Sequence, residues 1–365
     1  MAAFHVVLFH LTAGSLTHVP APVQRLLGHG PESVTIFFIL SGFVLVYTYR
    51  DRAAEDPKRF WWARVARIYP VYLLTLLVAL PMFLGHPPQY DNIQLETTPV
   101  PFGAAFNTHW AAGLACLLLL QAWLPPAVLK WNYPGWSLSA EAFFYVLFPW
   151  FGSVLARQSQ GRLWRIALAT WVASIGMTAG WWMISRQIPL QGIQPIWWGH
   201  VLQFNPLIRL PEFVIGMVIG FRFMDGVTPG RAAQGAALAA VAIIGMWMVP
   251  WSGVASRFEN SLLIPIYATL VLYLAYGEGR LGRWLASPTM VSLGKASYAL
   301  YLVHAPVIFM SAKLISRNQT PGPHYLRTVM ELLTTAAVAV GASLLIYRFV
   351  EEPARQRIRR WSARR

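Results

Sequence analysis

The sequence predicts an all-α polytopic membrane protein, a bundle of about ten transmembrane helices plus a short re-entrant or interfacial segment. Of its 365 residues, 56% are hydrophobic and only 12% are charged, whereas soluble domains carry about a quarter charged residues. The mean hydropathy is +0.47. Apolar runs long enough to cross a bilayer recur from one end of the chain to the other.

Ten apolar runs are candidate crossings. The first, MAAFHVVLFHLTAGS, has no basic n-region and is interrupted by His5 and His10, so it is not typical of a signal peptide. We interpret it as the first membrane helix. The ten runs cover approximately residues 2–19, 31–49, 68–85, 137–155, 164–184, 205–223, 232–250, 261–276, 290–315 and 326–349.

An eleventh, shorter run at 110–124 determines the topology. The 50–67 loop is rich in Arg and Lys and is expected in the cytoplasm, whereas the 86–109 loop has neither residue and is expected outside. If 110–124 crossed, the arginine-rich turn at 157–165 would lie outside, against the positive-inside rule. We therefore predict that this run does not cross and that both termini are cytoplasmic.

Charge and cysteine usage exclude several classes of protein. The net charge of +15 is explained by cytoplasmic loops, so we predict no nucleic-acid partner. The single cysteine, Cys116, excludes an internal disulfide and a multi-cysteine metal site. His5 and His10 lie about 140° apart around a helix, so we predict no metal and no permanently bound cofactor. We expect one membrane-embedded domain at 1–350 and a basic cytoplasmic tail at 351–365.

Ionisable side chains at bilayer depth are costly and are therefore candidate functional residues. His10 carries an imidazole suited to accepting a proton from a hydroxyl, although a lone histidine also serves as hydrogen-bonded structure. Glu141 follows the expected helix start at Gly135, where it is either a site residue or a partner of the helix dipole. We expect Ser137 or Ser139 to cap that helix.

Two further groups of polar residues lie in apolar runs. Arg209 and Glu212 are three positions apart and are expected to form an internal ion pair, alone or as part of a site lining. The stretch SYALYLVHAP places hydroxyls and an imidazole on neighbouring turns, as a polar seam that either packs the bundle or lines a site. Its residues are Ser297, Tyr298, Tyr301 and His304.

The stretch RFWWARVARIYPVYL brings arginines to the edge of an apolar run. Arg64 and Arg67 are three apart and share one face if the helix begins before Pro70. Neighbouring guanidiniums repel unless an anion lies between them, and phosphate fits that geometry. The pair is therefore interpreted as a site for the phosphates of a cytosolic cofactor, with lipid headgroups or simple orientation of the chain as alternatives.

At these residues the chain resembles the acyltransferase-3 family, bacterial membrane proteins that O-acylate, commonly O-acetylate, surface polysaccharides, lipopolysaccharide, peptidoglycan or small glycosides. Each matching segment is weak alone, but seven occur in order over nearly the whole chain. They are VVLFH, VTIFFILSGFVL, RFWWARVARIYPVYL, LLLLQAW with YPGWSLSAEAFFYVLFP, IRLPEFVIGMVIG, SLGKASYALYLVHAPV and YRFVEEPAR.

The resemblance implies roles for individual residues. His10 matches the histidine thought to be essential, and Arg64 and Arg67 match the R-x-x-R pair. The segment Met1–Ala3 stands where the family has an arginine-bearing segment such as GLRAIAA, so either residues precede Met1 in the natural protein or this chain is divergent. Other recurrent positions of the family fall on Trp136, Ser137, Glu141, Tyr298 and His304.

We therefore expect an O-acyltransferase of the bacterial inner membrane. It would move an acyl group, first of all acetyl, from cytosolic acyl-CoA to a hydroxyl of a surface carbohydrate or glycolipid. Arg64 and Arg67 would bind the CoA phosphates, and Glu141 and His10 would be catalytic, with His10 as general base or transient acyl carrier. A transporter or flippase of a glycan or lipid-linked sugar is the alternative, although no repeat supports it. A membrane scaffold ranks last. The sequence does not predict an oligomeric state.

Overall fold

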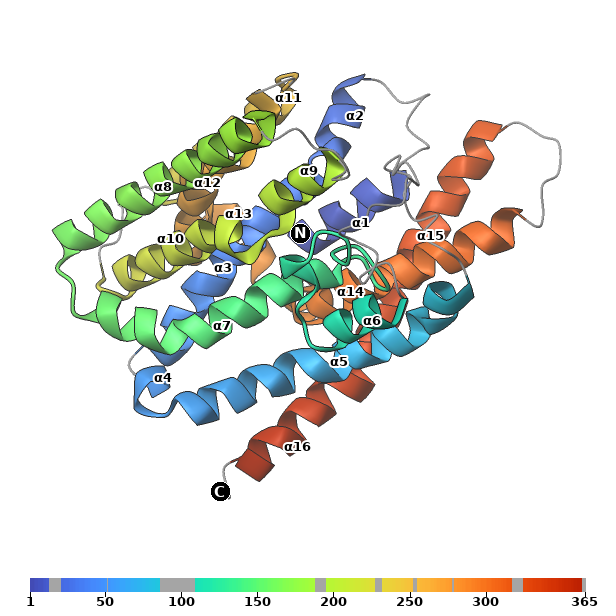
Figure 1. The fold of residues 1–365 in the computed structure, drawn as a ribbon, viewed down its shortest axis with the longest axis horizontal. Helices are drawn as coiled ribbons and strands as arrows, with labels where there is room; N and C mark the ends of the chain where they lie inside the picture. Colours follow the sequence, from blue (N-terminus) through green and yellow to red (C-terminus); the bar gives the residue numbers. More distant parts are fainter. Residues whose placement is uncertain are drawn as a thin grey trace.

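The computed structural model describes nearly all of the chain as helices (Figure 1). Seven helices are long and apolar enough to cross a membrane, and α1 and α11 are shorter apolar helices. These observations confirm an all-α polytopic membrane protein. The described residues are 1–12, 21–50, 52–85, 109–187, 195–226, 232–251, 255–277, 279–316 and 324–362.

Each of the ten apolar runs overlaps a helix in its described part, seven of these helices have the length and composition of a crossing, and residues 13–19 of the first run lie outside the described residues. Short helices fill several connections. The helices are α1 (Ala2–Thr12), α2 (Ala21–Gly28), α3 (Gly30–Tyr49), α4 (Arg52–Glu55), α5 (Pro57–Gly85), α6 (His109–Leu117), the 3₁₀ helix η3 (Gln121–Trp123), α7 (Gly135–Ala156), α8 (Gln160–Gln187), α9 (Pro195–Phe204), α10 (Pro206–Met224), α11 (Ala232–Met248), α12 (Ala255–Ala275), α13 (Gly279–Leu285), α14 (Pro288–Ser316), α15 (His324–Ile346), the π-helix η4 (Tyr347–Glu351) and α16 (Glu352–Ser362).

The run at 110–124 does not form a membrane-length helix. Helix α6 has nine residues, less than half of the length that a crossing needs. Leu119 then takes a positive φ of 56° and ends the helical path. The predicted short, non-crossing segment is therefore present.

Helix α5 is longer than the apolar pattern predicted. It begins at Pro57 rather than near residue 68 and continues through Pro70 and Pro81. The arginine stretch is therefore the first part of the helix itself, and Arg64 and Arg67 lie one turn apart on it. Figure 1 shows α5 running along the lower edge of the bundle, with α16 beneath it.

Helices α3 and α10 cross at the centre of the bundle in backbone contact. A Cβ on Gly216 would lie 2.0 Å from the carbonyl oxygen of Ile39, and one on Gly42 would lie 2.2 Å from that of Phe213. Only glycine permits this approach, as is common where membrane helices pack closely. The two hydrophobic cores meet at this crossing, one on the α5, α7 and α14 side and the other on the α11 and α12 side.

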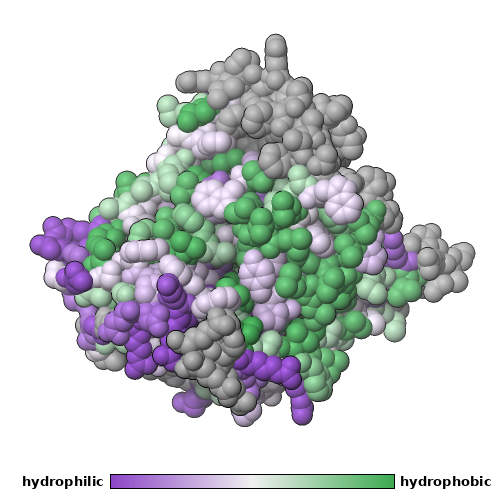
Figure 2. Space-filling model, turned by 60° about the horizontal axis from the view of Figure 1, so that its bottom comes forward, coloured by the Kyte–Doolittle hydropathy of each residue, from purple (hydrophilic) through white to green (hydrophobic). Residues whose placement is uncertain are grey.

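The outer surface is largely apolar, as expected for helices that face lipid. Leu77, Val154 and Leu168 are each more than half exposed on three different helices. Figure 2 shows broad hydrophobic areas together with a hydrophilic cluster on the face that carries the lower edge of Figure 1. The sequence and the surface therefore both indicate a multi-pass membrane protein.

Candidate active site

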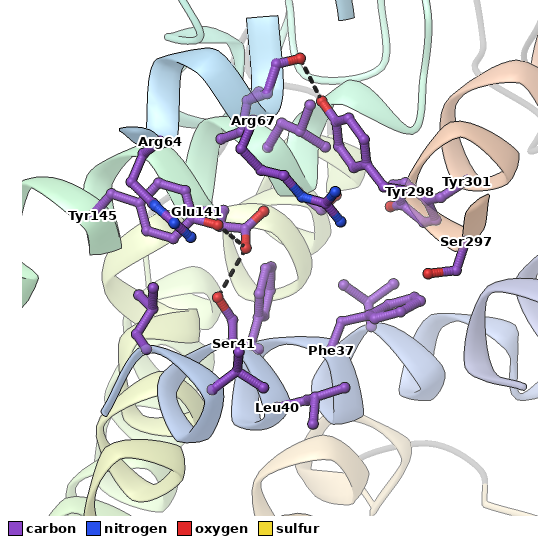
Figure 3. A pocket seen from close by; sticks show the side chains of 17 residues that line it. Phe37, Leu40, Ser41, Arg64, Arg67, Glu141, Tyr145, Ser297, Tyr298 and Tyr301 are labelled. Atoms are coloured by element: carbon purple, nitrogen blue, oxygen red, sulfur yellow. Dashed lines mark hydrogen bonds between the residues drawn. The ribbon is translucent and has the colours of Figure 1, made fainter. Parts of the chain in front are cut away.

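A cavity of about 250 Å³ lies between α3, α5, α7 and α14. Its polar lining includes two guanidiniums and one carboxylate, and α3 contributes an apolar wall (Figure 3). Of the residues predicted for the site, this cavity brings together Arg64, Arg67, Ser137, Glu141, Ser297 and Tyr298.

Arg64 is held by neutral, electron-rich groups. Its guanidinium donates a 2.6 Å hydrogen bond to the Tyr49 hydroxyl and lies 4.9 Å from the centre of that ring. The rings of Phe60 and Tyr145 are each 5.6 Å away. Among the described residues no carboxylate forms an ion pair with Arg64, so its charge is available to an anion in the cavity.

Arg67 is held differently, by a carboxylate behind it. Its guanidinium forms an ion pair with Glu351 on η4, and it also lies 5.5 Å from the centre of the Tyr298 ring. Glu351 is only 1% exposed and does not line the cavity. The two arginines therefore differ, because Arg67 already has a counter-ion and Arg64 does not.

Glu141 lies in the second turn of α7 and points into the cavity. Its Oε1 accepts hydrogen bonds from the Tyr145 hydroxyl at 2.5 Å and from the Ser41 hydroxyl at 2.8 Å (Figure 3). It is not a first-turn partner of the helix dipole. Two donors fix the carboxylate while it stays in contact with the cavity.

The predicted serine cap of α7 is wrong. The N-cap residue is Pro134, and no side chain caps the helix. Ser137 Oγ donates to the Pro134 carbonyl, and Ser139 Oγ donates to the Leu119 carbonyl. Both hydroxyls are buried and therefore need a hydrogen-bond partner. The bond of Ser139 joins α7 to the segment before η3.

Three residues of the polar seam on α14 line the cavity: Ser297, Tyr298 and Tyr301. Ser297 donates to the carbonyl of Gly294, and Tyr298 donates to that of Ile68 on α5. Tyr301 also lines the cavity, one turn further along the helix. The seam therefore combines both predicted roles, since it packs α14 against α5 and lines the cavity.

His10 does not line the cavity, because the ring of His304 lies between His10 and Tyr301 of the cavity wall. The ring centre of His304 is 6.0 Å from that of Tyr301 and 5.2 Å from that of His10. Tyr133 closes the group, 4.6 Å from His10. His304 is fully buried, and the polar groups next to its ring in the described part of the chain are the backbone carbonyls of Leu300 and Tyr301 on its own helix. The two histidines therefore belong to a buried aromatic group next to the Tyr301 wall of the cavity.

The remaining predicted residues lie outside the cavity. Arg209 and Glu212 form the expected ion pair at 3.1 Å, and Thr35 links the two. The guanidinium of Arg209 lies 6.0 Å from the centre of the Trp136 ring and 5.4 Å from that of Phe38, which does line the cavity. This pair therefore supports the cavity wall from behind.

Several site residues were not predicted from the sequence. Tyr145 lies four positions after Glu141, a spacing that places both on one helix face and could have indicated the contact. Ser41, Tyr49 and Glu351 lie on other segments, and only the tertiary fold brings them to the arginines and to Glu141.

The fold and the cavity together define a class, a polytopic membrane protein with a cationic, half-apolar cavity beside a pair of histidines. The chain belongs to the acyltransferase-3 family, because the family's acyltransferase domain matches residues 1–348. It is therefore a membrane acyltransferase. No solved structure matches the chain significantly.

Three curated relatives illustrate the similarity. The acyltransferase MdmB of Streptomyces mycarofaciens is 31% identical over 334 residues, 89% of this chain and 80% of that protein. The exopolysaccharide production protein ExoZ of Rhizobium meliloti is 28% identical over 298 residues, 78% of each chain. The peptidoglycan O-acetyltransferase OatA of Listeria monocytogenes is 22% identical over 335 residues, 88% of this chain but 51% of that protein.

Proposed function

We propose that this acyltransferase moves an acyl group, in the first instance acetyl, from cytosolic acyl-CoA to a hydroxyl of a surface carbohydrate or glycoconjugate. It would act in the bacterial inner membrane with both termini in the cytoplasm. The names of two relatives, a peptidoglycan O-acetyltransferase and an exopolysaccharide production protein, support an acetyl group and a polysaccharide or peptidoglycan acceptor. The single observation that carries the proposal is the cavity with two arginines in its lining, whose Tyr301 wall contacts His304, which in turn stacks on His10.

The donor would bind with its phosphates at the arginine end. Arg64 has no carboxylate partner among the described residues and would provide the principal charge, while Arg67, held by Glu351, would add directed N–H groups. The apolar side of the cavity, with Phe37 and Leu40 of α3, would accommodate the acyl-bearing arm (Figure 3).

Transfer would occur at the histidine end. The acceptor hydroxyl gives its proton to the His10 imidazole, its oxygen bonds to the thioester carbonyl carbon, and the carbon–sulfur bond breaks. The CoA thiolate leaves and takes the proton from the imidazolium. In the alternative order, His10 first accepts the acyl group and then passes it to the hydroxyl. Glu141 would be the second catalytic residue. Its carboxylate faces the cavity and is fixed there by hydrogen bonds from Ser41 and Tyr145.

Reconstituted protein tests the reaction directly. Proteoliposomes would receive acetyl-labelled acetyl-CoA together with peptidoglycan fragments or exopolysaccharide. The proposal expects a base-labile acetyl ester on the carbohydrate and release of one CoA thiol per ester. Movement of the carbohydrate across the bilayer without ester formation would instead support the transporter alternative.

The donor site has a separate test. Arg64→Ala should weaken acetyl-CoA binding by about 10–100-fold, the effect of losing a charge-assisted hydrogen bond of ~1.5–3 kcal/mol. The salt dependence of binding should also become shallower. Arg157→Ala, at the end of α7 and outside the cavity, is the matched control. Equal affinities for both variants would refute the phosphate role of Arg64.

A further inference from the structure

Three metal-ligating side chains meet at the start of α3, at the opposite end of that helix from the Arg64 contact with Tyr49. His29 precedes the helix, Glu32 lies in its first turn, and Glu259 belongs to α12. His29 Nδ1 is 3.0 Å from Glu259 Oε1 and 3.6 Å from Glu32 Oε2. The acyl transfer proposed above uses none of the three.

The orientation of the His29 ring is fixed from its other side. Its Nε2 lies 3.0 Å from the carbonyl oxygen of Trp247, which can only accept a hydrogen bond, so Nε2 carries the proton. The ring also stacks on the indole of Trp247 with centres 5.4 Å apart. Metal-bound histidines are commonly oriented by such a carbonyl. Nδ1 is thereby presented to the two carboxylates as a ligand.

The carboxylate oxygens lack sufficient hydrogen-bond donors. The side chains of His29, Glu32 and Glu259 are 14%, 12% and 7% exposed, and in the described residues the two oxygens that face Nδ1 share that one nitrogen as their polar partner. A protonated His29 would offer one Nδ1–H to two oxygens and leave one net negative charge. A divalent cation would coordinate both oxygens and leave none, which is favoured where water is scarce.

The spacing also fits a metal ion. Ligand atoms ~2.0–2.1 Å from a tetrahedral zinc ion stand about 3.3–3.4 Å apart, between the two observed separations. We propose that His29 Nδ1, Glu32 Oε2 and Glu259 Oε1 bind a divalent transition-metal ion, zinc being the best fit. The fourth position would hold water or a substrate oxygen. The proposal departs from the sequence-based prediction of no metal, which considered only cysteines and the pair His5 and His10.

The experiment measures zinc on the whole protein in detergent. Protein stripped with a chelator is equilibrated with zinc, and bound metal is measured by mass spectrometry after gel filtration. We expect about one zinc ion per chain and an unfolding temperature that rises with zinc concentration. His29→Ala and Glu259→Gln should each bind at least about tenfold less zinc.

Two matched variants and a second metal keep the outcome decisive. His200→Ala removes a buried histidine that contacts the Pro125 carbonyl and the Phe204 ring. Glu352→Gln removes a partly exposed glutamate. Both variants should retain the ion. Cobalt(II) should give the visible bands of a tetrahedral site in wild-type protein and lose them in the monodisperse Glu259→Gln variant. If wild-type protein binds no more zinc than Glu259→Gln and its unfolding temperature does not respond, the cluster is an ion pair only.

Discussion

The two ends of α3 contact buried polar regions of opposite character. From Val34 to Leu45, α3 borders the cavity, which is lined by the cations Arg64 and Arg67 with one carboxylate, Glu141. At its start, two carboxylates face one imidazole, His29. Excess positive charge selects an anionic ligand and excess negative charge selects a cation, so the difference predicts a phosphate-bearing donor at one end and a metal ion at the other.

The largest expected effect is on the rate of acyl transfer, and it should differ between the two histidines of α1. His10 lies towards the cavity and His5 towards the start of α3. His10→Ala should lower acyl transfer by about 10²–10⁴-fold, because the acceptor hydroxyl loses its base. His5 is bonded to Ser33 and to the carbonyl of Leu26 near the start of α3, so His5→Gln should keep most of the rate. Initial rates of ester formation measure both. A similar loss in the two variants would mean that α1 acts only through its packing.

A smaller effect tests the counter-ion behind the cavity. Glu351→Gln breaks the ion pair between the buried Glu351 and Arg67, which is 29% exposed, and should destabilise the protein by about 1.5–3 kcal/mol. The adjacent Glu352 is 28% exposed and pairs with Arg355, so Glu352→Gln should cost at most about 1 kcal/mol. Thermal unfolding in detergent compares the variants. Equal stabilities would show that the cation-rich region does not depend on Glu351.

The next effect concerns protein stability and tests the crossing of α3 and α10. A methyl group at Gly216 would overlap the Ile39 carbonyl, so Gly216→Ala should cost about 1–3 kcal/mol through overpacking. Gly176, within α8, has open space around its Cα, and Gly176→Ala should be neutral or gain up to about 1 kcal/mol of helix propensity. Unfolding temperatures distinguish the two. No loss for Gly216→Ala would place α3 and α10 further apart than described.

The smallest effect concerns the segment that stops short of crossing. Burial raises the pKa of the Cys116 thiol to about 12. The residue as a whole is only 1% exposed. Maleimide at pH 7–8 should therefore label folded protein slowly and protein in dodecyl sulfate rapidly, because only the thiolate reacts. Rapid labelling of the folded enzyme would mean that α6 is open to water. Cys116→Ser, which has no thiol, provides the background.

Hydropathy predicted most of the fold because membrane-spanning helices need a minimum apolar length. It placed the seven helices of membrane-crossing length and the short segment at 110–124. It missed the early start of α5, where Arg59, Arg64 and Arg67 lower the local hydropathy although the helix continues. It also missed α2, which has eight residues and is too short to stand out from a loop.

Prediction of the candidate site was limited by long-range contacts. The arginine spacing and the polar seam of α14 identified side chains that line the cavity, because helical periodicity relates residues one turn apart. The ion pair of Arg67 with Glu351 and the meeting of His29 with Glu259 join residues more than two hundred positions apart. No local pattern in a single sequence encodes such a pairing.

The glycine crossing of α3 and α10 limits how the enzyme can move during turnover. With backbone against backbone at Gly42 and Gly216, those two helices have no side-chain layer along which to slide or separate. A rocking motion of the kind that exposes a central site alternately to each side of a membrane would have to break that contact. Donor and acceptor are therefore expected to reach the cavity when α5 or α14 moves. The α3–α10 pair would stay in place while both substrates bind and leave.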